Sequence, residues 1–196
     1  MRRYVLAGFV SCVLAGLFLG AVRFLDPPTP PAHNHWRGGM VRVGYAVEGN
    51  FAFKNALGVV TGESPEVARV VLERAGVREV NWVRMDFGEL IGQLESGAID
   101  MIATGMRITP ARAARVAFSL PTCRVGDGHL HDEPPGVDSN AGGEPASGLC
   151  AFAFRKRDAR LLEAVNRELR DYLGTPEHLH LLGQFGLKPD AVIVPN

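Results

Sequence analysis

The chain has 196 residues, of which 46% are hydrophobic and 21% are charged, so it has enough apolar residues for one globular domain and is not intrinsically disordered. Twenty-one basic residues balance twenty-one acidic residues. Because the formal net charge is zero, no overall electrostatic field favours binding to nucleic acid or to an anionic membrane surface.

The first residues have the pattern of an export signal. Arg2 and Arg3 precede an uncharged, mostly apolar stretch from Tyr4 to Val22. That stretch is also close to the roughly 20 residues that span a bilayer. Residues 1–25 are therefore predicted to be either a cleaved signal peptide or an uncleaved membrane anchor. Both readings place the folded part in the periplasm or on the outer face of the cytoplasmic membrane. Lipidation at Cys12 is disfavoured, because the apolar run before it is short.

Residues 26–39 are predicted to be a semi-rigid tether, because they hold four prolines and show no apolar periodicity. Past Met40, strand and helix patterns alternate, with Ser64 as a helix N-cap and Asp86 with Glu89 as a capping-box variant. The predicted elements are a strand over 41–46, a helix over 64–76, a strand over 79–84, a helix over 86–97 and a short buried strand over 99–103. This order predicts parallel βαβ units, which bind ligands beyond the carboxyl ends of their strands.

The composition changes after Thr122. Residues 123–148 hold six glycines and three prolines but few large apolar residues, so they are predicted to be a short linker. The pattern then predicts an apolar strand over 149–154, a charged amphipathic helix over 158–173 and a last helix from Thr175 to about Phe185, which Gly186 closes.

Several motifs occur in a characteristic order. They lie at 43–46, 58–68, 86–91, 97–100, 105–112 and 118–122, and then at 151–156, Asn166 and 185–186. In this order they resemble the polar amino-acid family of extracytoplasmic solute-binding proteins (family 3), in particular its ectoine/hydroxyectoine-binding branch. The resemblance implies an α/β fold of the periplasmic-binding-protein type II: one lobe with an open, mostly parallel sheet flanked by helices.

The resemblance also implies the domain organisation. Residues 40–122 together with 149–187 correspond to lobe 1, residues 123–148 stand where the family has a second lobe, and residues 188–196 form a tail. We therefore expect the solute-binding component of an ABC importer with most of its second lobe missing. Because good sites bury roughly 70–90% of a small ligand's surface, we expect this one-lobed form to bind weakly.

The family's ligands carry a carboxylate and usually a cationic nitrogen, so their site needs a fixed guanidinium and an acid or aromatic faces. Arg112 matches the carboxylate-binding arginine, with Gly105 and Thr109 beside it; the alternative is a surface arginine of a short helix. Glu48, Phe51 and Phe87 match an acid and an aromatic cage. For the phenylalanines the alternative is ordinary core, and for Glu48 a solvated carboxylate.

Arg107 departs from the family pattern, which has threonine or an aromatic residue at this position. A cation beside the ligand would repel another cation by roughly 1 kcal/mol or more. If Arg107 points inward, a plain carboxylate or dianionic ligand is favoured over ectoine; if it points outward, it has no bearing on the ligand.

Cys123 and Cys150 stand at the two ends of the shortened connection, where the resemblance implies paired strands. A disulfide is expected there outside the cytoplasm, and two free thiols are the alternative. The six histidines form three His-x-His pairs, of which His129 and His131, followed by two acids, suggest a metal carrier as a third-choice function. No metal or other cofactor is predicted.

No motif indicates catalysis, since the sequence lacks Gly-x-Ser-x-Gly, a Walker loop, His-Glu-x-x-His and Cys-x-x-Cys. Asp86 and Glu89 are better explained as helix caps than as an acid/base pair. We therefore expect no enzyme. The expected partners are a small zwitterionic or carboxylate-bearing solute and an ABC permease in the membrane. The alternative is a membrane-tethered protein-interaction module derived from a solute-binding lobe.

Overall fold

The computed structural model of the protein describes Trp36, residues 38–124 and residues 148–187. The predictions for the leader and for most of the tether and linker, His129 and His131 included, lie outside these residues. Within the described part, no helix is long and apolar enough to cross a membrane.

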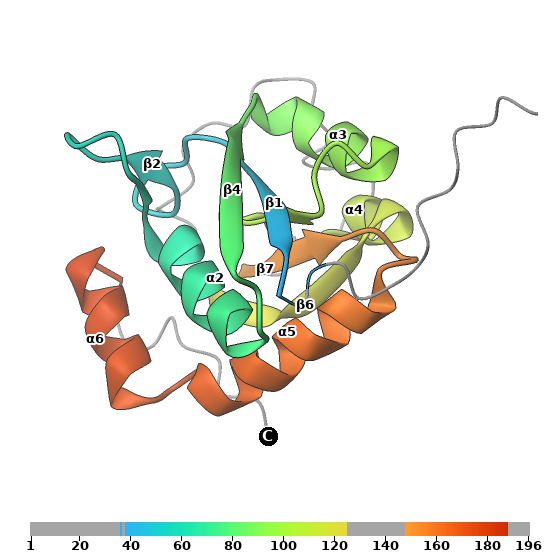
Figure 1. Cartoon of the computed structure of the whole chain (residues 1–196). Helices are drawn as coiled ribbons and strands as arrows, with labels where there is room; N and C mark the ends of the chain where they lie inside the picture. Colours follow the sequence, from blue (N-terminus) through green and yellow to red (C-terminus); the bar gives the residue numbers. More distant parts are fainter. Residues whose placement is uncertain (1–35, 37, 125–147, 188–196) are drawn as a thin grey trace, which may run out of the picture. The chain divides into compact units, whose positions relative to one another are not determined.

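Five strands form one sheet in the order β4-β1-β5-β7-β6 (Figure 1). Their bounds are β1 Met40–Tyr45, β4 Glu79–Arg84, β5 Met101–Ile102, β6 Ala117–Arg124 and β7 Leu149–Phe154. β1 is parallel to β4 and β5, whereas β7 is antiparallel to β5 and β6. Four strands therefore share one direction, which confirms the predicted mostly parallel sheet. The short hairpin of β2 (Phe53–Lys54) and β3 (Val60–Thr61) was not predicted.

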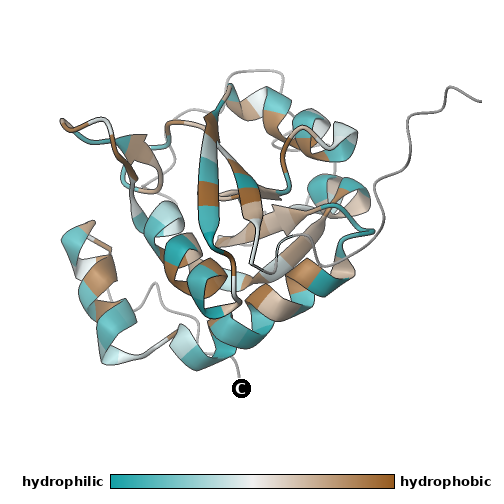
Figure 2. Ribbon diagram, in the orientation of Figure 1, coloured by the Kyte–Doolittle hydropathy of each residue, from teal (hydrophilic) through white to brown (hydrophobic). Residues whose placement is uncertain are grey.

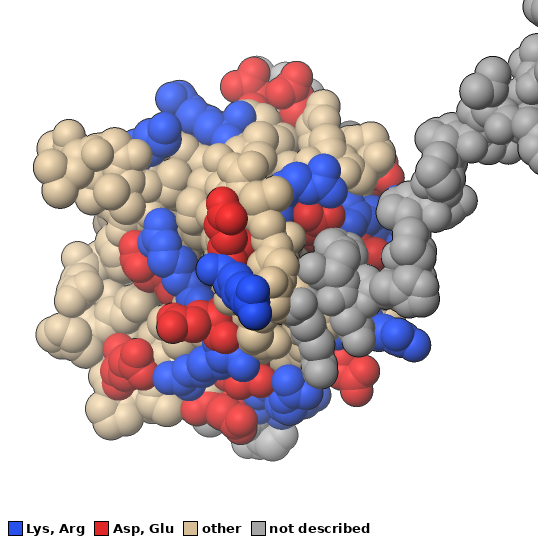
Figure 3. Space-filling model, in the orientation of Figure 1, with Lys and Arg blue, Asp and Glu red and all other residues tan. Residues whose placement is uncertain are grey.

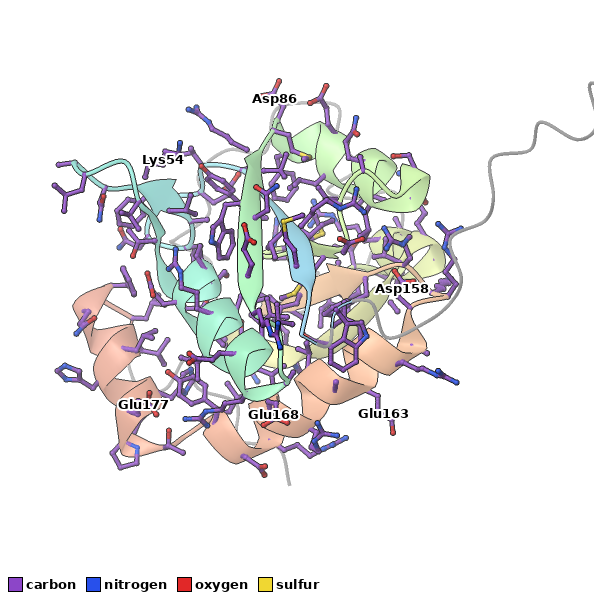
Figure 4. The ribbon with its side chains drawn as sticks, viewed as in Figure 1. Lys54, Asp86, Asp158, Glu163, Glu168 and Glu177 are labelled. Carbon is purple, nitrogen blue, oxygen red and sulfur yellow. The ribbon has the colours of Figure 1, made fainter. Side chains whose placement is uncertain are left out.

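Helices cover both faces of the sheet, and the predicted helices are all present. Their bounds are α2 Glu63–Arg74, α3 Leu90–Ser96 after the 3-10 turn η1 Phe87–Glu89, α4 Pro110–Arg115, α5 Ala159–Tyr172 and α6 Pro176–Gln184. α5 follows its charged amphipathic pattern and buries Leu161, Val165 and Leu169. Its outer side carries the exposed Glu163, which Figure 4 shows pointing away from the sheet.

Residues alternate between two cores along the central strands. Met101 and Phe152 pack in the core under α2 and α5, whereas Ile102 and Ala153 pack in the core under α3. Gly44 lets α3 and the segment after it approach β1, because a Cβ there would lie 3.2 Å from Cδ2 of Leu90 and 2.3 Å from Cδ1 of Ile99. The hydrophobic residues of α2 and α5 face the sheet and their hydrophilic residues face outward (Figure 2). Acidic and basic side chains are interspersed over this outer face (Figure 3), as the net charge of zero suggests.

The start of α2 differs from the prediction. Ser64 is not the N-cap; the cap is Gly62, and the Ser64 hydroxyl donates to the Glu63 carboxylate at 2.6 Å. Gly62 has φ +122°, and a Cβ there would lie 2.6 Å from the Phe51 carbonyl oxygen. A close backbone approach therefore places the helix start two residues earlier. Similarly, Asp86 is the N-cap of η1 but makes no capping hydrogen bond with its side chain.

A buried carboxylate joins three strands at the amino ends of β1 and β5. Asp100 accepts hydrogen bonds from the Arg42 side chain at 2.8 and 3.0 Å and from Arg155 at 2.9 Å. Burial acts to raise the pKa of Asp100, but these hydrogen bonds outweigh it, so its pKa lies below the usual range. Removing one arginine would leave Asp100 with a single cationic partner, and removing both would leave a buried charge without compensation, which is strongly destabilising.

His178 is a buried neutral imidazole at the start of α6. Its Nδ1 accepts a hydrogen bond from the Gly174 amide at 3.1 Å, and its ring lies 5.2 Å from that of Tyr172. Burial lowers the pKa of His178 from 6.5 to about 4. The unfolded chain therefore binds a proton more readily than the folded chain between these two values.

We expect the fold to lose stability as the pH falls from about 6.5 towards about 4, because His178 must remain neutral in the folded state. The loss due to this residue should be about 1–2 kcal/mol at about pH 5. Chemical denaturation at about pH 6.5 and at about pH 5 measures this difference in the free energy of unfolding. His178→Asn keeps an acceptor for the Gly174 amide but cannot titrate, so its stability should fall less. Equal losses in the variant and the parent would contradict this assignment.

Candidate functional site

The candidate site lies where the loops after β1 and β5 meet, at the carboxyl ends of these parallel strands. The buried Thr104 joins the two loops: its hydroxyl donates to the Ala46 carbonyl at 2.9 Å and accepts from the Ala46 amide at 3.2 Å. Sequence reasoning missed Thr104, although a polar residue directly after a buried strand is a usable signal. It brings the loop with Glu48 and Phe51 beside the loop with Gly105.

Gly105 is the contact point between these loops. Its φ is +70°, and a Cβ there would lie 2.7 Å from Cγ and 2.8 Å from Cβ of Phe51. The Phe51 ring therefore packs directly on the Gly105 backbone. Because Phe51 is itself only half-buried, it is more than a core residue and borders the surface of the site.

Arg112 is a buried cation with a fixed position, only 9% exposed. Its guanidinium carbon lies 5.0 Å from the centre of the Phe87 ring, and its Nη1 donates to the Arg107 carbonyl at 3.1 Å. Thr109 is the N-cap of α4 and accepts from the Arg112 amide at 3.3 Å. The reading of Arg112 as an ordinary surface arginine does not fit this burial. A planar guanidinium held between a ring and a carbonyl suits a carboxylate.

Glu48 closes a tight turn after β1. Its carbonyl accepts from the Phe51 amide at 2.8 Å, and its amide donates to the Ala52 carbonyl at 2.8 Å, while its side chain is half-buried. Asp86 stands at the edge where β4 ends, just before Phe87 (Figure 4). Acidic groups thus lie on the same edge of the sheet as Arg112.

Arg107 belongs to a segment that continues the sheet beside β7. It forms an antiparallel bridge with Cys150, and the Ile108 amide donates to the Leu149 carbonyl at 2.9 Å. Its side chain is half-buried. The backbone carbonyl of Arg107 thus links this segment to Arg112. Both directions considered for the Arg107 side chain, inward and outward, stay predictions.

Cys123 and Cys150 are directly opposite one another on β6 and β7, as the resemblance implies. Both are buried free thiols in this structure, and Phe51 packs against them. The disulfide between them stays a prediction. In the described residues, no group of three or more histidine, cysteine, aspartate or glutamate side chains is arranged to hold a metal ion.

We expect Gly105→Ala to destabilise the fold by about 1–3 kcal/mol, because alanine is strained at this φ and its methyl group collides with Phe51. Gly92→Ala on α3 is the matched control, since its Cβ would meet nothing within 4 Å. Because alanine has a higher helix propensity than glycine, Gly92→Ala should stabilise the fold by about 0.5–1 kcal/mol. Chemical denaturation of both variants tests this. An unchanged Gly105→Ala variant would show that Phe51 moves aside without cost.

Residues 41–185 match the family model of bacterial extracellular solute-binding proteins, family 3. A probable amino-acid ABC transporter periplasmic-binding protein of Sinorhizobium fredii is 37% identical over 132 residues, which are 66% of this chain and 44% of that protein. A probable histidine-binding protein of Campylobacter jejuni is 37% identical over 62 residues, which are 32% of this chain and 24% of that protein. The chain spans less than half the length of these curated relatives.

Solved structures show the same fold. The arginine-bound form of domain 1 from TmArgBP is 32% identical, with a TM-score of 0.54, and the match covers 68% of this chain and 93% of that one. EhuB in complex with hydroxyectoine has a TM-score of 0.63 at 22% identity, covering 76% of this chain and 89% of that one. Because the family match extends over most of the chain, this protein belongs to the bacterial extracellular solute-binding proteins, family 3.

Proposed function

We propose that this chain is the solute-binding component of an ABC importer and that it holds a polar amino acid or an ectoine-like solute by its carboxylate at Arg112. The observation that carries the proposal is the fixed, buried guanidinium at the carboxyl ends of β1 and β5. Open α/β sheets bind ligands at this edge. The membrane partner would be an ABC permease, and the protein would act outside the cytoplasm.

The other residues of the candidate site have separate roles in this proposal. Phe51 and Phe87 offer aromatic faces to the solute, and Glu48 offers a carboxylate to its cationic nitrogen. Gly105 keeps the backbone close to Phe51, and Thr109 holds the first turn of α4. If the Arg107 side chain points inward, its positive charge favours solutes with more carboxylate than cationic character; if it points outward, it has no bearing on the solute.

A single lobe is compatible with solute binding. Domain 1 of TmArgBP is itself a single domain, its crystal structure is an arginine-bound form, and 93% of it is covered by the match to this chain. This supports solute retention by the lobe that β1–β7 form here. We propose that residues 123–148 replace the second lobe, so that the solute is held from one side and binds more weakly than between two lobes.

We expect Arg112→Gln to weaken binding of the solute roughly tenfold to hundredfold, because a charge-assisted hydrogen bond contributes about 1.5–3 kcal/mol. Calorimetry with arginine, histidine, glutamate, ectoine and hydroxyectoine first identifies the solute. Its carboxamide analogue should bind the parent protein as poorly as the solute binds Arg112→Gln.

Arg115→Gln is the matched control for this experiment. Arg115 lies on the same helix, α4, but pairs with Glu95 at 2.7 Å and is about half exposed, so its loss should leave solute affinity unchanged. Equal affinities of parent and Arg112→Gln for a solute would contradict the proposed role of Arg112. An absence of heat with every solute would contradict solute binding itself.

The second candidate function is a protein-interaction module, and one observation favours it. Leu57 and Val59, at the turn between β2 and β3, are 88% and 48% exposed. Apolar side chains exposed together often mark an interface. If this is correct, Leu57→Ser should abolish a cross-linked partner of the exported protein, whereas Leu179→Ser on α6 should not. A monomer in sedimentation without any cross-linked partner would rule it out.

A further inference from the structure

The two described cysteines are placed for a covalent bond. Cys123 and Cys150 are register partners on the antiparallel strands β6 and β7, and both are fully buried. Directly opposite residues of such a pair have Cα atoms about 4.5–5.5 Å apart, and disulfides need about 4.4–6.8 Å. The register alone therefore satisfies the distance that a disulfide requires.

The same pair touches the candidate site from two directions. Phe51, which packs on Gly105, also packs against the two cysteines. On the side of Cys150 away from β6, the backbone bridges to Arg107, whose carbonyl holds the Arg112 guanidinium. Whether the two cysteines are bonded can therefore affect the Phe51 ring and the Arg107 carbonyl, which accepts a hydrogen bond from Arg112.

The surroundings of the thiols oppose reaction in the folded protein. The hydrogen bond with Cys150, burial and the nearby carboxyl of Glu63 all raise the pKa of Cys123 well above its ordinary value. Because both thiols are fully buried, an external disulfide reaches them only when the strands separate, and the raised pKa of Cys123 also disfavours its reactive thiolate. A bond between these cysteines is therefore expected to form while the chain folds.

We propose that Cys123 and Cys150 form a disulfide during folding outside the cytoplasm, and that this bond fixes the 105–108 segment and Phe51 in the positions that the candidate site needs. The inference deepens the proposed function, since it assigns a redox-dependent support to that site. A disulfide-bearing oxidant is the second reactant, either a thiol–disulfide oxidoreductase or a small disulfide. Both cysteine thiols give up their protons and together two electrons, the Sγ–Sγ bond forms, and the oxidant's disulfide is cleaved to two thiols.

Peptide mapping of the exported full chain tests the bond directly. The protein is denatured with an alkylating agent and digested without reductant, and we expect the peptides with Cys123 and Cys150 to be recovered as one linked species. Cys123→Ala is the control, in which Cys150 should be alkylated. Recovery of both cysteines as alkylated thiols from the parent protein would overturn the proposal.

The timing is tested without any substitution. The chain is reduced in denaturant and divided into two samples. The first sample is refolded in the presence of oxidised glutathione. The second is refolded without an oxidant and receives oxidised glutathione only after folding. Only the first sample should acquire the bond in quantity. Equally rapid closure in the folded sample would overturn the claim that the bond forms before the strands pack.

Hydrogen exchange tests the connection to the site. The amides of Ile108 and Ala151 bond across the 105–108 segment and β7, to the carbonyls of Leu149 and Met106. Their exchange should be roughly tenfold or more slower in the bonded form than in the reduced, refolded form. The Asp100 amide, which bonds to Arg42 at the opposite end of β1, is the control and should change less.

Equal exchange of Ile108 and Ala151 in the two forms would show that the bond does not support the site. These measurements involve no solute, so they can succeed or fail independently of solute binding at Arg112. Conversely, a solute that binds through Arg112 equally well to reduced and bonded protein would preserve the proposed function and refute the coupling.

Discussion

The insertion of β7 between β5 and β6 is the constraint on which the rest of this lobe depends. β5 contributes only Met101 and Ile102, and β6 is an edge strand whose one neighbour in the sheet is β7. A strand from the C-terminal part of the chain thus holds together elements from the N-terminal part. α5 directly follows β7 and covers the face where Phe152 and Phe154 lie, so one return of the chain supplies both a central strand and its covering helix.

The two ends of the sheet have different structures. At the amino ends of β1 and β5, the buried Asp100 is held by the mostly buried Arg155 and by the partly exposed Arg42. At the carboxyl ends, the loops are joined by Thr104 and by the contact of Phe51 with Gly105, and the side chains beyond are half-buried. An end cross-linked by ion pairs thus lies opposite an end with partly accessible side chains, which is an arrangement that suits a binding site on loops.

Arg112 is the residue of the candidate site whose surroundings the structure describes most fully. Family membership follows from motifs spread over the chain, whereas the choice of solute in the proposed site would depend on a few side chains around one guanidinium. The Phe87 ring and the Arg107 carbonyl hold that guanidinium in place within a single lobe. In the site that we propose, this guanidinium would orient the solute's carboxylate, and holding the solute from one side would reduce affinity more than orientation.

The sequence by itself determined the α/β class and most of the elements, because apolar periodicity and turn residues are local properties: β4 and β7 have the predicted bounds, and α3 ends at Ser96 before Gly97. It also singled out Arg112 through a resemblance. Only the tertiary structure decided that α2 begins at Glu63 rather than after Ser64, that β2 and β3 form a hairpin, and that Thr104 joins two loops. These features depend on contacts between residues that are not sequence neighbours, such as Gly62 with the Phe51 carbonyl and Thr104 with the distant Ala46, and the periodicity of one element does not encode such contacts.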